Sequence, residues 1–375
     1  MFGTNKSNYN KFWIYDYCQH FELKQEFIDA YRQKGKFFED AQYFYDYMNT
    51  SPHPVFKKDK DTIEPTSISF TNIMIDINTL KILFCLLPNT KVITLKFSSN
   101  CFEFSNFEYL MNQIMIKSTN VYNFIFEWND EIIVDGKIYK IGELYKKTEE
   151  IISNTVQQMV LKQKQIVAKL TTHPKFDSLC LRGMFLGDEA GMILFENLKN
   201  NNSLRVLNVY RNLFTSKLTS TICQVLNVNR KIEELNLGCN KFGDDDFIAI
   251  ANELGKIRLS STEVEDYQAK LKEKNEAIEK NKKAKGNKKL EVPVPNVPDL
   301  DIVGDKYYIV KNNKVKTLNL MQNNFTNSIF YNILELQENS DELLIVLDKR
   351  IFEKNEIDKL SDYKNKYTSK IYLVK

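Results

Sequence analysis

A short motif of two apolar residues separated by one position returns at a constant interval along this chain. The interval is 28 residues, and the motif occurs as Leu179-Cys180-Leu181, Leu207-Asn208-Val209 and Leu235-Asn236-Leu237. Asparagine follows at one fixed offset in two copies, as Asn212 and Asn240, whereas Met184 stands there in the first copy. A period of this length indicates a repeat architecture, in which each unit buries its apolar side against its neighbours.

The residue types within one copy indicate which side chains point into the core and which point outward. Alternate side chains of a strand point to opposite faces, so Leu207 and Val209 are predicted to point inward and Asn208 and Tyr210 outward. Asn212 follows where the chain leaves the strand. Its amide side chain can both donate to and accept from backbone groups that the bend would leave unpaired.

The second half of each copy has the apolar spacing of a helix. In TSKLTSTICQVLNVN the apolar residues that share one helical face are Leu218, Ile222, Val225 and Leu226. One strand and one helix cannot order themselves alone, so neighbouring units must cover both flanks. We therefore predict an α/β fold of the leucine-rich repeat type, a curved solenoid with parallel strands on the concave side and helices on the convex side.

Weaker copies extend the pattern in both directions. The pairs are Ile68 and Phe70, Leu95 and Phe97 before Asn100, Phe124 and Phe126 before Asn129, and Leu318 and Leu320 before Asn323. The segment LLIVLDK has lost the asparagine and is predicted to belong to a closing unit. The count is seven or eight units.

The array is interrupted between Leu235 and Leu318, which lie 83 residues apart without an intervening copy. Thr262 and Glu265 have capping-box spacing at the start of a charged helix. A proline-containing extended segment follows, and then two short strands about a Gly304-Asp305 turn.

These features divide the chain into six predicted segments. They are residues 1–60, an aromatic-rich helical cap or docking arm; 61–130, weak repeats; 131–176, a helical irregular unit; 177–255, strong repeats; 256–314, a lysine-rich insertion; and 315–375, a final repeat with a C-terminal cap. For the first segment both possibilities stay open, since an exposed array end needs a cover and aromatic side chains also dominate protein interfaces.

Composition excludes several function classes. The net charge of +3 gives no broad field for nucleic acid or membranes. The six cysteines are scattered without metal-ligand spacing and read as free thiols of a reducing compartment. We find no secretory signal and no apolar run long enough to cross a membrane. We therefore expect a cytoplasmic protein.

Catalytic constellations are not found in the sequence. His20, His53 and His173 lie in three separate regions, and none has a nucleophile context. GDDDF at 243–247 and GDEAG at 187–191 occupy equivalent turns, where acidic residues favour a helix N-terminus. We expect a non-enzymatic protein without cofactor, metal or small-molecule substrate.

Protein binding is the remaining class. The candidate residues are Lys96, Arg182, Asn208, Tyr210, Asn236 and Asn319 on the outward strand positions, and Lys282 and Lys283 in the lysine run. The lysine run KNKKAKGNKK could meet an acidic protein surface or nucleic acid, although a solvated loop is the ordinary alternative. No aromatic residues interleave it for base stacking, so nucleic acid is not the expected partner.

The middle of the chain resembles the ribonuclease-inhibitor-like class of leucine-rich repeat proteins. The resemblance rests on LCLRGMFLGDEAG, LRVLNVYRNLF, IEELNLGCNKFGDDDF and VKTLNLMQNNF. Over 179–325 the array breaks at LSSTEVEDYQAKL and resumes at DKYYIVKNNKVKTLNLMQNNFT, which is similar to the ciliary family of the leucine-rich-repeat-containing protein numbered seventy-one. Members of that family carry Gly-Asn before the resumed repeat, where this chain has Asn312-Asn313.

The resemblance implies a scaffold of the ciliary axoneme, within the cytoskeleton, whose partners are axonemal or microtubule-associated proteins. An alternative function stays open. A soluble regulator, of the inhibitor or GTPase-activating type, would instead bind one globular partner in the concave groove.

Overall fold

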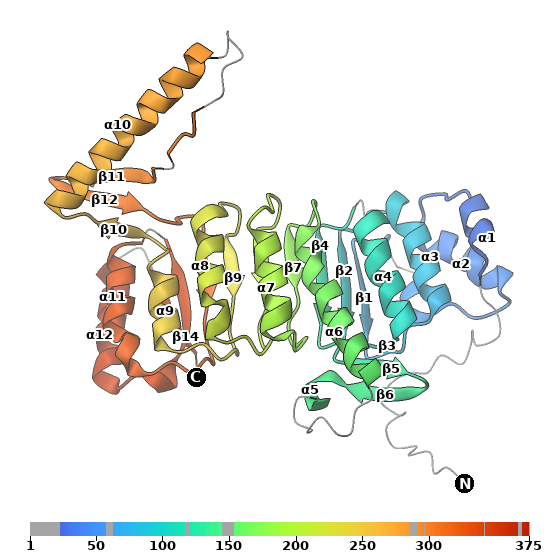
Figure 1. Ribbon diagram of the computed structural model, residues 1–375. Coiled ribbons are helices and arrows are strands. Elements are labelled where there is room, and N and C mark those ends of the chain that lie inside the picture. The colour runs from blue at the N-terminus through green and yellow to red at the C-terminus, as the bar shows by residue number, and fades with distance from the viewer. Residues whose placement is uncertain are drawn as a thin grey trace. The chain divides into compact units, whose positions relative to one another are not determined.

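The computed structural model describes residues 23–57, 63–117, 120–144, 154–284, 292–295, 297–340, 342–366 and 370–374. The fold is α/β, with a large parallel sheet (Figure 1). The chain divides into two compact units. The first comprises Met1–Phe242 and Leu318–Asn324, and the second comprises Gly243–Thr317 and Phe325–Lys375.

Nine described strands form the large sheet in the order β1-β2-β4-β7-β8-β9-β13-β14-β15. Their bounds are β1 Ser67–Thr71, β2 Thr94–Ser98, β4 Asn123–Glu127, β7 Ser178–Cys180, β8 Val206–Asn208, β9 Glu234–Asn236, β13 Thr317–Asn319, β14 Leu344–Asp348 and β15 Lys370–Val374. The strand order follows the chain order, as expected when each unit stacks on the one before it.

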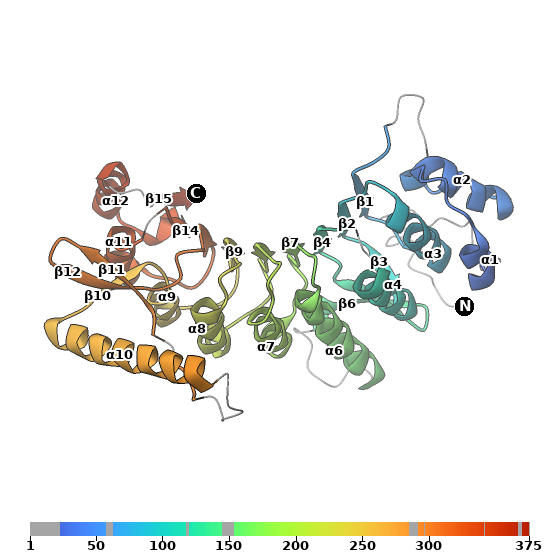
Figure 2. The ribbon, with the colours of Figure 1, turned by 90° about the horizontal axis from the view of Figure 1, so that it is seen from above.

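The described helices of the first unit are α1 Gln25–Ala30, α2 Phe37–Tyr47, α3 Ile77–Leu86, α4 Phe104–Lys117, α5 Ile141–Leu144, α6 Asn154–Ala168, α7 Gly187–Leu198 and α8 Thr219–Val228, with 3-10 turns at Pro54–Phe56, Leu87–Asn89, Lys169–Thr172 and Ser216–Leu218. Helices α3, α4, α6, α7 and α8 line one face of the strands (Figures 1 and 2). Successive helices α3, α4, α6, α7 and α8 contact one another. The predicted inward face of α8 is buried.

The register of the strands follows the predicted repeat. Leu179 pairs with Leu207 and Leu207 with Leu235 in parallel. The Leu237 amide then donates to the Asn319 carbonyl at 2.8 Å, which continues the register into β13. The weaker copies pair in the same way, with Ile68 opposite Leu95, Leu95 opposite Phe124 and Phe124 opposite Leu179. The predicted alignment of the leucine pairs in one sheet is confirmed.

The buried asparagines form a ladder between units, as predicted for Asn212. Its amide nitrogen donates to the Leu181 carbonyl at 2.9 Å, and its side-chain oxygen accepts from the Leu186 amide at 3.3 Å. The backbone amide of Asn212 donates in turn to the Asn240 side chain at 3.0 Å. Each asparagine therefore satisfies backbone groups of its own and adjacent units, which water cannot reach.

A second asparagine ladder, not predicted, lies beyond the C-terminal ends of the helices. Asn201 and Asn229 are 28 residues apart, like the strand motifs. Asn229 donates to the Leu198 carbonyl at 2.7 Å and accepts from the Ile232 amide at 3.1 Å. This ladder fixes the return from helix to strand in the same way that the first fixes the exit from the strand.

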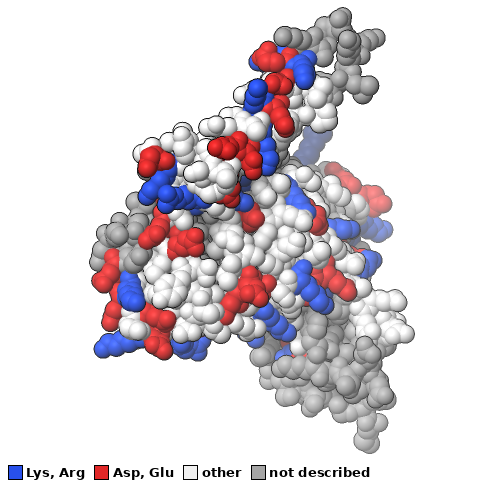
Figure 3. Space-filling view, turned by 60° about the vertical axis from the view of Figure 1, so that its left-hand side comes forward, with Lys and Arg blue, Asp and Glu red and all other residues white. Residues whose placement is uncertain are grey.

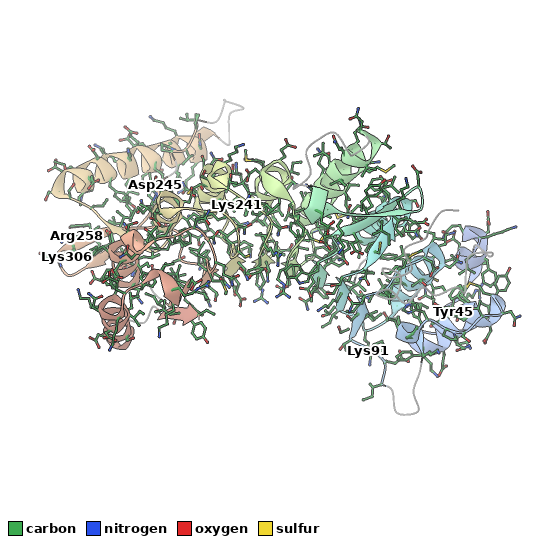
Figure 4. All side chains as sticks on the ribbon, turned by 90° about the horizontal axis from the view of Figure 1, so that it is seen from below. Tyr45, Lys91, Lys241, Asp245, Arg258 and Lys306 are labelled. Atoms are coloured by element: carbon green, nitrogen blue, oxygen red, sulfur yellow. The ribbon has the colours of Figure 1, made fainter. Side chains whose placement is uncertain are left out.

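The N-terminal helices pack against the first repeat. Helices α1 and α2 contact α3, and the aromatic rings of Phe37, Phe44 and Phe56 are fully buried. Tyr45 of α2 is also buried (Figure 4), whereas Tyr43 and Tyr47 remain 45% and 51% exposed. Residues 23–57 thus cover α3 as a cap would, while their outer aromatic side chains stay available for contact. Residues 1–22 lie outside the described residues.

The segment 131–176 is not purely helical, which corrects the prediction. It opens with a hairpin of β5 Glu131–Val134 and β6 Lys137–Lys140, and β5 pairs with β3 Cys101–Glu103. Asp135 and Gly136 form the turn with φ of +50° and +73°, which is typical of an Asp-Gly hairpin. The helical spacing of the following residues concealed this turn. The predicted long helix is represented by α5 and α6, and 145–153 lie outside the described residues.

The second unit contains the predicted insertion. Its elements are α9 Asp244–Ala251, β10 Lys256–Arg258, α10 Ser261–Ala284, β11 Asp299–Val303, β12 Lys306–Val310, α11 Phe330–Glu338 and α12 Lys354–Lys366, with 3-10 turns at Asn327–Ile329 and Lys349–Ile351. Strands β10, β12 and β11 form a small antiparallel sheet, and the two predicted strands about Gly304-Asp305 are confirmed. Outside the large sheet, the insertion therefore has its own secondary structure.

Two details of the second unit differ from the prediction. The capping box of α10 uses Ser260 and Glu263: the Ser260 amide donates to Glu263 at 2.8 Å, and the Glu263 amide donates to the Ser260 hydroxyl at 3.4 Å. The assignment to Thr262 and Glu265 was wrong because the helix begins at Ser261. Beyond β14 the sheet continues into the unpredicted strand β15, which pairs with β14 in parallel.

Candidate protein-binding surface on the sheet

The predicted candidate residues of the first unit lie on the sheet face opposite the helices. Lys96 belongs to β2, Asn208, Asn236 and Asn319 end β8, β9 and β13, and Arg182 and Tyr210 follow β7 and β8. We call this the sheet face. Lys282 lies in α10 of the second unit, where it pairs with Glu279 at 3.3 Å. The side chain of Lys283 lies outside the described residues.

Charges of both signs alternate along α10 (Figure 3). The exposed ion pair of Lys282 with a glutamate three residues away is of the ordinary helix-surface kind. This favours the solvated interpretation of the described part of the lysine run.

The three strand-end asparagines have a local role that the sequence did not reveal. The side-chain oxygens of Asn208, Asn236 and Asn319 accept the backbone amide two residues further on, at 3.0, 3.0 and 3.1 Å. This contact is the turn that short polar side chains form with their own backbone. These residues therefore shape the rim of the sheet face and offer a partner only their remaining amide hydrogens.

Lys96 and Arg182 are brought together by a residue that was not predicted, Glu127. This glutamate is 7% exposed, and its carboxylate lies 2.8 Å from Lys96 Nζ and 3.3 Å from Arg182 Nε. The Ser98 hydroxyl and the Cys180 thiol also donate to it, at 3.3 and 3.8 Å. A buried carboxylate needs such compensation, and two cations around one anion leave the cluster positive.

The Cys180 thiol is held protonated. Burial, together with the charge of the nearby Glu127 carboxylate, raises its pKa to about 11. A neutral thiol can donate to Glu127 but is a poor nucleophile. Cys180 is therefore part of the packing around Glu127 and not a reactive group.

A left-handed backbone recurs in the repeats of the first compact unit at one position, four residues after the first buried residue of each strand. The row consists of Asn72, Ser99, Trp128, Gly183, Arg211, Cys239 and Gln322, with φ between +53° and +68°. The backbone amides of this row extend the sheet ladder; that of Trp128, for example, donates to the Arg182 carbonyl at 2.8 Å. The backbone of this row is therefore held in place by the sheet. Each non-glycine residue in the row pays about 1–2 kcal/mol for its left-handed conformation.

Trp128 occupies the place that Gly183 leaves empty. A Cβ on Gly183 would lie only 2.0 Å from Cε3 of Trp128. Gly183 is the single row member without a side chain, so the indole leans from its own unit across the next one. This close approach, together with a φ of +68°, explains why glycine is needed here.

Two guanidinium groups stack on the indole. Arg182 and Arg211 each place their guanidinium carbon 5.3 Å from the centre of the Trp128 ring, and Arg211 also lies 5.9 Å from the ring centre of Phe185. Arginine stacked on an aromatic ring keeps its planar donors in a fixed orientation. We call Trp128, Arg182 and Arg211 the Trp-Arg cluster.

A cavity of about 420 Å³ adjoins the cluster. It is lined by Asn72, Ser99, Asn100, Trp128, Asp130, Glu131 and Lys140. Burial, followed by the charge of Glu131, raises the pKa of Asp130. Lys140 lies 3.6 Å from Glu131 and partly compensates these acids. The cavity is therefore polar and lies beside the stacked aromatic ring, as expected for the edge of a binding surface.

Neither of the residues Trp128 and Arg211 was predicted, although the repeat alignment contains a signal for them. Both stand at the row position, where the other units have small or polar residues. Comparing the copies at the position four residues after the first buried strand residue would have found two bulky residues at a site that normally avoids them.

The acidic turns have the structural role that was expected, with an added contact. Asp188 at the start of α7 accepts from the amide and hydroxyl of Thr215 at 2.8 Å each. Asp244 of α9 accepts from Thr326 at 2.8 and 2.6 Å in the same way. Each aspartate thus joins a helix start to the loop that precedes the helix of the following unit.

The two described histidines are buried and neutral. Burial lowers the pKa of His53 and of His173 to about 4. Nδ1 of each accepts a backbone amide two residues further on, at 3.2 and 3.3 Å. These contacts place both histidines in the packing of loops. His20 lies outside the described residues.

Comparisons with known proteins do not assign the chain. No protein-family model matches it, and no curated protein matches it. Among the helices of the described ranges, none has the length and apolarity to cross a membrane. No cluster of three or more histidine, cysteine, aspartate or glutamate side chains in the same ranges could hold a metal ion.

Proposed function

We propose that this chain is a leucine-rich repeat protein of the ribonuclease-inhibitor-like class and that it acts as a non-enzymatic scaffold for other proteins. The repeated strand and helix, the parallel register and the buried asparagine ladder support the class. In such an array the strands line a concave side, so the sheet face would be the concave, partner-binding side.

The observation that carries the binding role is the Trp-Arg cluster. Tryptophan and arginine dominate the binding energy of protein interfaces when they are held in place. Here the indole lies over Gly183 and the two guanidinium groups lie over the indole. These side chains are already ordered, so they would lose little conformational entropy when a partner binds. Trp128 and Arg211 lie on left-handed backbone, and the hydrogen bonds of their amides to the next repeat hold it in place.

We place the scaffold in the ciliary axoneme, with axonemal or microtubule-associated proteins as partners. This step rests on the resemblance of 179–325, where a repeat array is interrupted by a charged helix and resumes at VKTLNLMQNNF. The structure is compatible with an excisable insertion, since the Lys311 amide donates to the Gly255 carbonyl at 2.8 Å and brings its two ends together.

Extraction of detergent-stripped cilia tests the location. A scaffold is expected to stay with the microtubules in low salt and to leave only in high salt. A soluble regulator would wash out with the detergent, and that result would favour the alternative of one globular partner in the concave groove. The full chain should be compared with an Arg211→Gln variant, because loss of cluster contacts should lower the salt concentration that releases the protein.

A further inference from the structure

We infer that the Trp-Arg cluster recognises an acidic segment of a protein partner, with a carboxylate held between the guanidinium groups of Arg182 and Arg211. This inference rests on the proposed scaffold function and specifies the chemistry of its partner. Three features of the structure support this inference. They are the cations around Trp128, the fixed N–H donors of the two arginines, and the indole ring that supports those arginines.

The charge balance favours an anion. Glu127 is a single carboxylate that already serves both Lys96 and Arg182. Arg211 is exposed and forms no ion pair with any acidic group among the described residues. Asp130 lies within electrostatic range of Arg211 but forms no ion pair with it, and burial, followed by the charge of Glu131, raises its pKa. Around Trp128 the cations Lys96, Lys140, Arg182 and Arg211 thus stand beside three carboxylates, those of Glu127, Asp130 and Glu131. Among the described residues, Arg211 is the member of this group that no carboxylate pairs directly, so its guanidinium can accept a further carboxylate.

The donor geometry favours a carboxylate on a protein over a nucleic acid. Arginine presents two parallel donors that match the two oxygens of a carboxylate. A nucleobase would need a free aromatic face for stacking. The Trp128 ring instead has Gly183 packed against it and two guanidinium groups over it. The indole thus serves as a support for the arginines and is not open to a base.

The Trp128 fluorescence can report the binding event. The chain has two tryptophans, so a Trp13→Phe background leaves Trp128 as the sole indole. A carboxylate that draws the guanidinium groups away from the ring, or dries their surroundings, should change this emission. The probes are a short glutamate-rich peptide, a lysine-rich peptide of equal length, and an oligothymidylate.

The expected result is saturable binding of the glutamate-rich peptide by the full chain, and weakening by about tenfold or more in Arg211→Gln, since a charge-assisted contact is lost. Lys241→Gln is the matched control. Lys241 is exposed in the loop after β9 (Figure 4) and is not a member of the cluster, so this variant removes the same charge from the neighbouring repeat. It should bind the peptide as the parent does. Unfolding curves verify that both variants are folded.

Three outcomes would overturn the inference. The first is no response to the glutamate-rich peptide, the second is an equal loss in Lys241→Gln, which would indicate general electrostatics, and the third is tighter binding of the oligothymidylate. If any of these occurs while the protein still stays with stripped axonemes, the scaffold function stands and only the acidic partner is wrong. If the peptide binds but the protein washes out of the stripped axonemes, the acidic partner stands and the scaffold function is wrong.

Discussion

Replacing Gly183 by alanine should dislodge Trp128 and destabilise the first unit. The added Cβ would lie 2.0, 2.3 and 2.7 Å from three atoms of the indole, all well inside van der Waals contact. The left-handed backbone of Gly183 adds about 1–2 kcal/mol for any L residue, and overpacking adds about 1–3 kcal/mol. The expected loss in the free energy of unfolding is therefore about 2–5 kcal/mol.

A matched control separates the two terms. Gly136 has a similar φ of +73°, but nothing lies within 4 Å of a Cβ built there. Gly136→Ala should therefore cost only the backbone term of about 1–2 kcal/mol. Urea unfolding followed by circular dichroism measures both variants, and Trp128 emission in the Trp13→Phe background should shift only for Gly183→Ala.

A double-mutant cycle completes the test. In a Trp128→Ala background the clash is removed, so the cost of Gly183→Ala should fall to that of Gly136→Ala. If Gly183→Ala costs the same with and without the indole, Trp128 does not rest on Gly183 and the support for the Arg182 and Arg211 stacking is lost.

The periodic features of this chain could be predicted because spacing alone encodes them. Parallel register follows once the strand motif repeats every 28 residues, and the ladder role of Asn212 follows from a polar residue at the exit of each buried strand. Even weak copies, such as Ile68 and Phe70, took their predicted places opposite Leu95 and Phe97.

The features that break the period could not be predicted in the same way. Trp128 and Gly183 are 55 residues apart, across a segment that does not repeat, and only the fold brings them together. The hairpin at Asp135-Gly136 was hidden because a stronger helical pattern followed it. Glu127 resembled an ordinary strand-end charge until the structure placed Lys96 and Arg182 around it.

Three further perturbations have defined outcomes. Asn212→Ala should cost about 2–4 kcal/mol in urea unfolding, because it leaves buried backbone groups without partners, whereas Asn208→Ala should cost less than about 1 kcal/mol; equal costs would contradict the ladder. The free energy of unfolding should fall as pH drops from 6.5 towards 4, because burial lowers the pKa of His53 and His173 to about 4 and the unfolded chain therefore binds protons first. Each histidine should account for a loss of about 1–2 kcal/mol at pH 5. His173→Gln should reduce the slope of stability against pH, and an unchanged slope would refute the role of His173. Deleting residues 256–311 should leave cooperative unfolding of the rest, because the ends of the insertion are hydrogen-bonded, and weaken recovery with axonemes; normal recovery would count against the insertion as an anchor.

Site-specific photo-crosslinking decides whether the sheet face is the surface that binds partners. Benzoylphenylalanine would replace Tyr210 beside the Trp-Arg cluster, or Ser220 on the exposed side of α8 as the control, in cilia that assemble the protein. The scaffold interpretation predicts defined adducts from position 210 and few from position 220. Adducts from position 220 alone would contradict it, because the helices and not the strands would then face the partner.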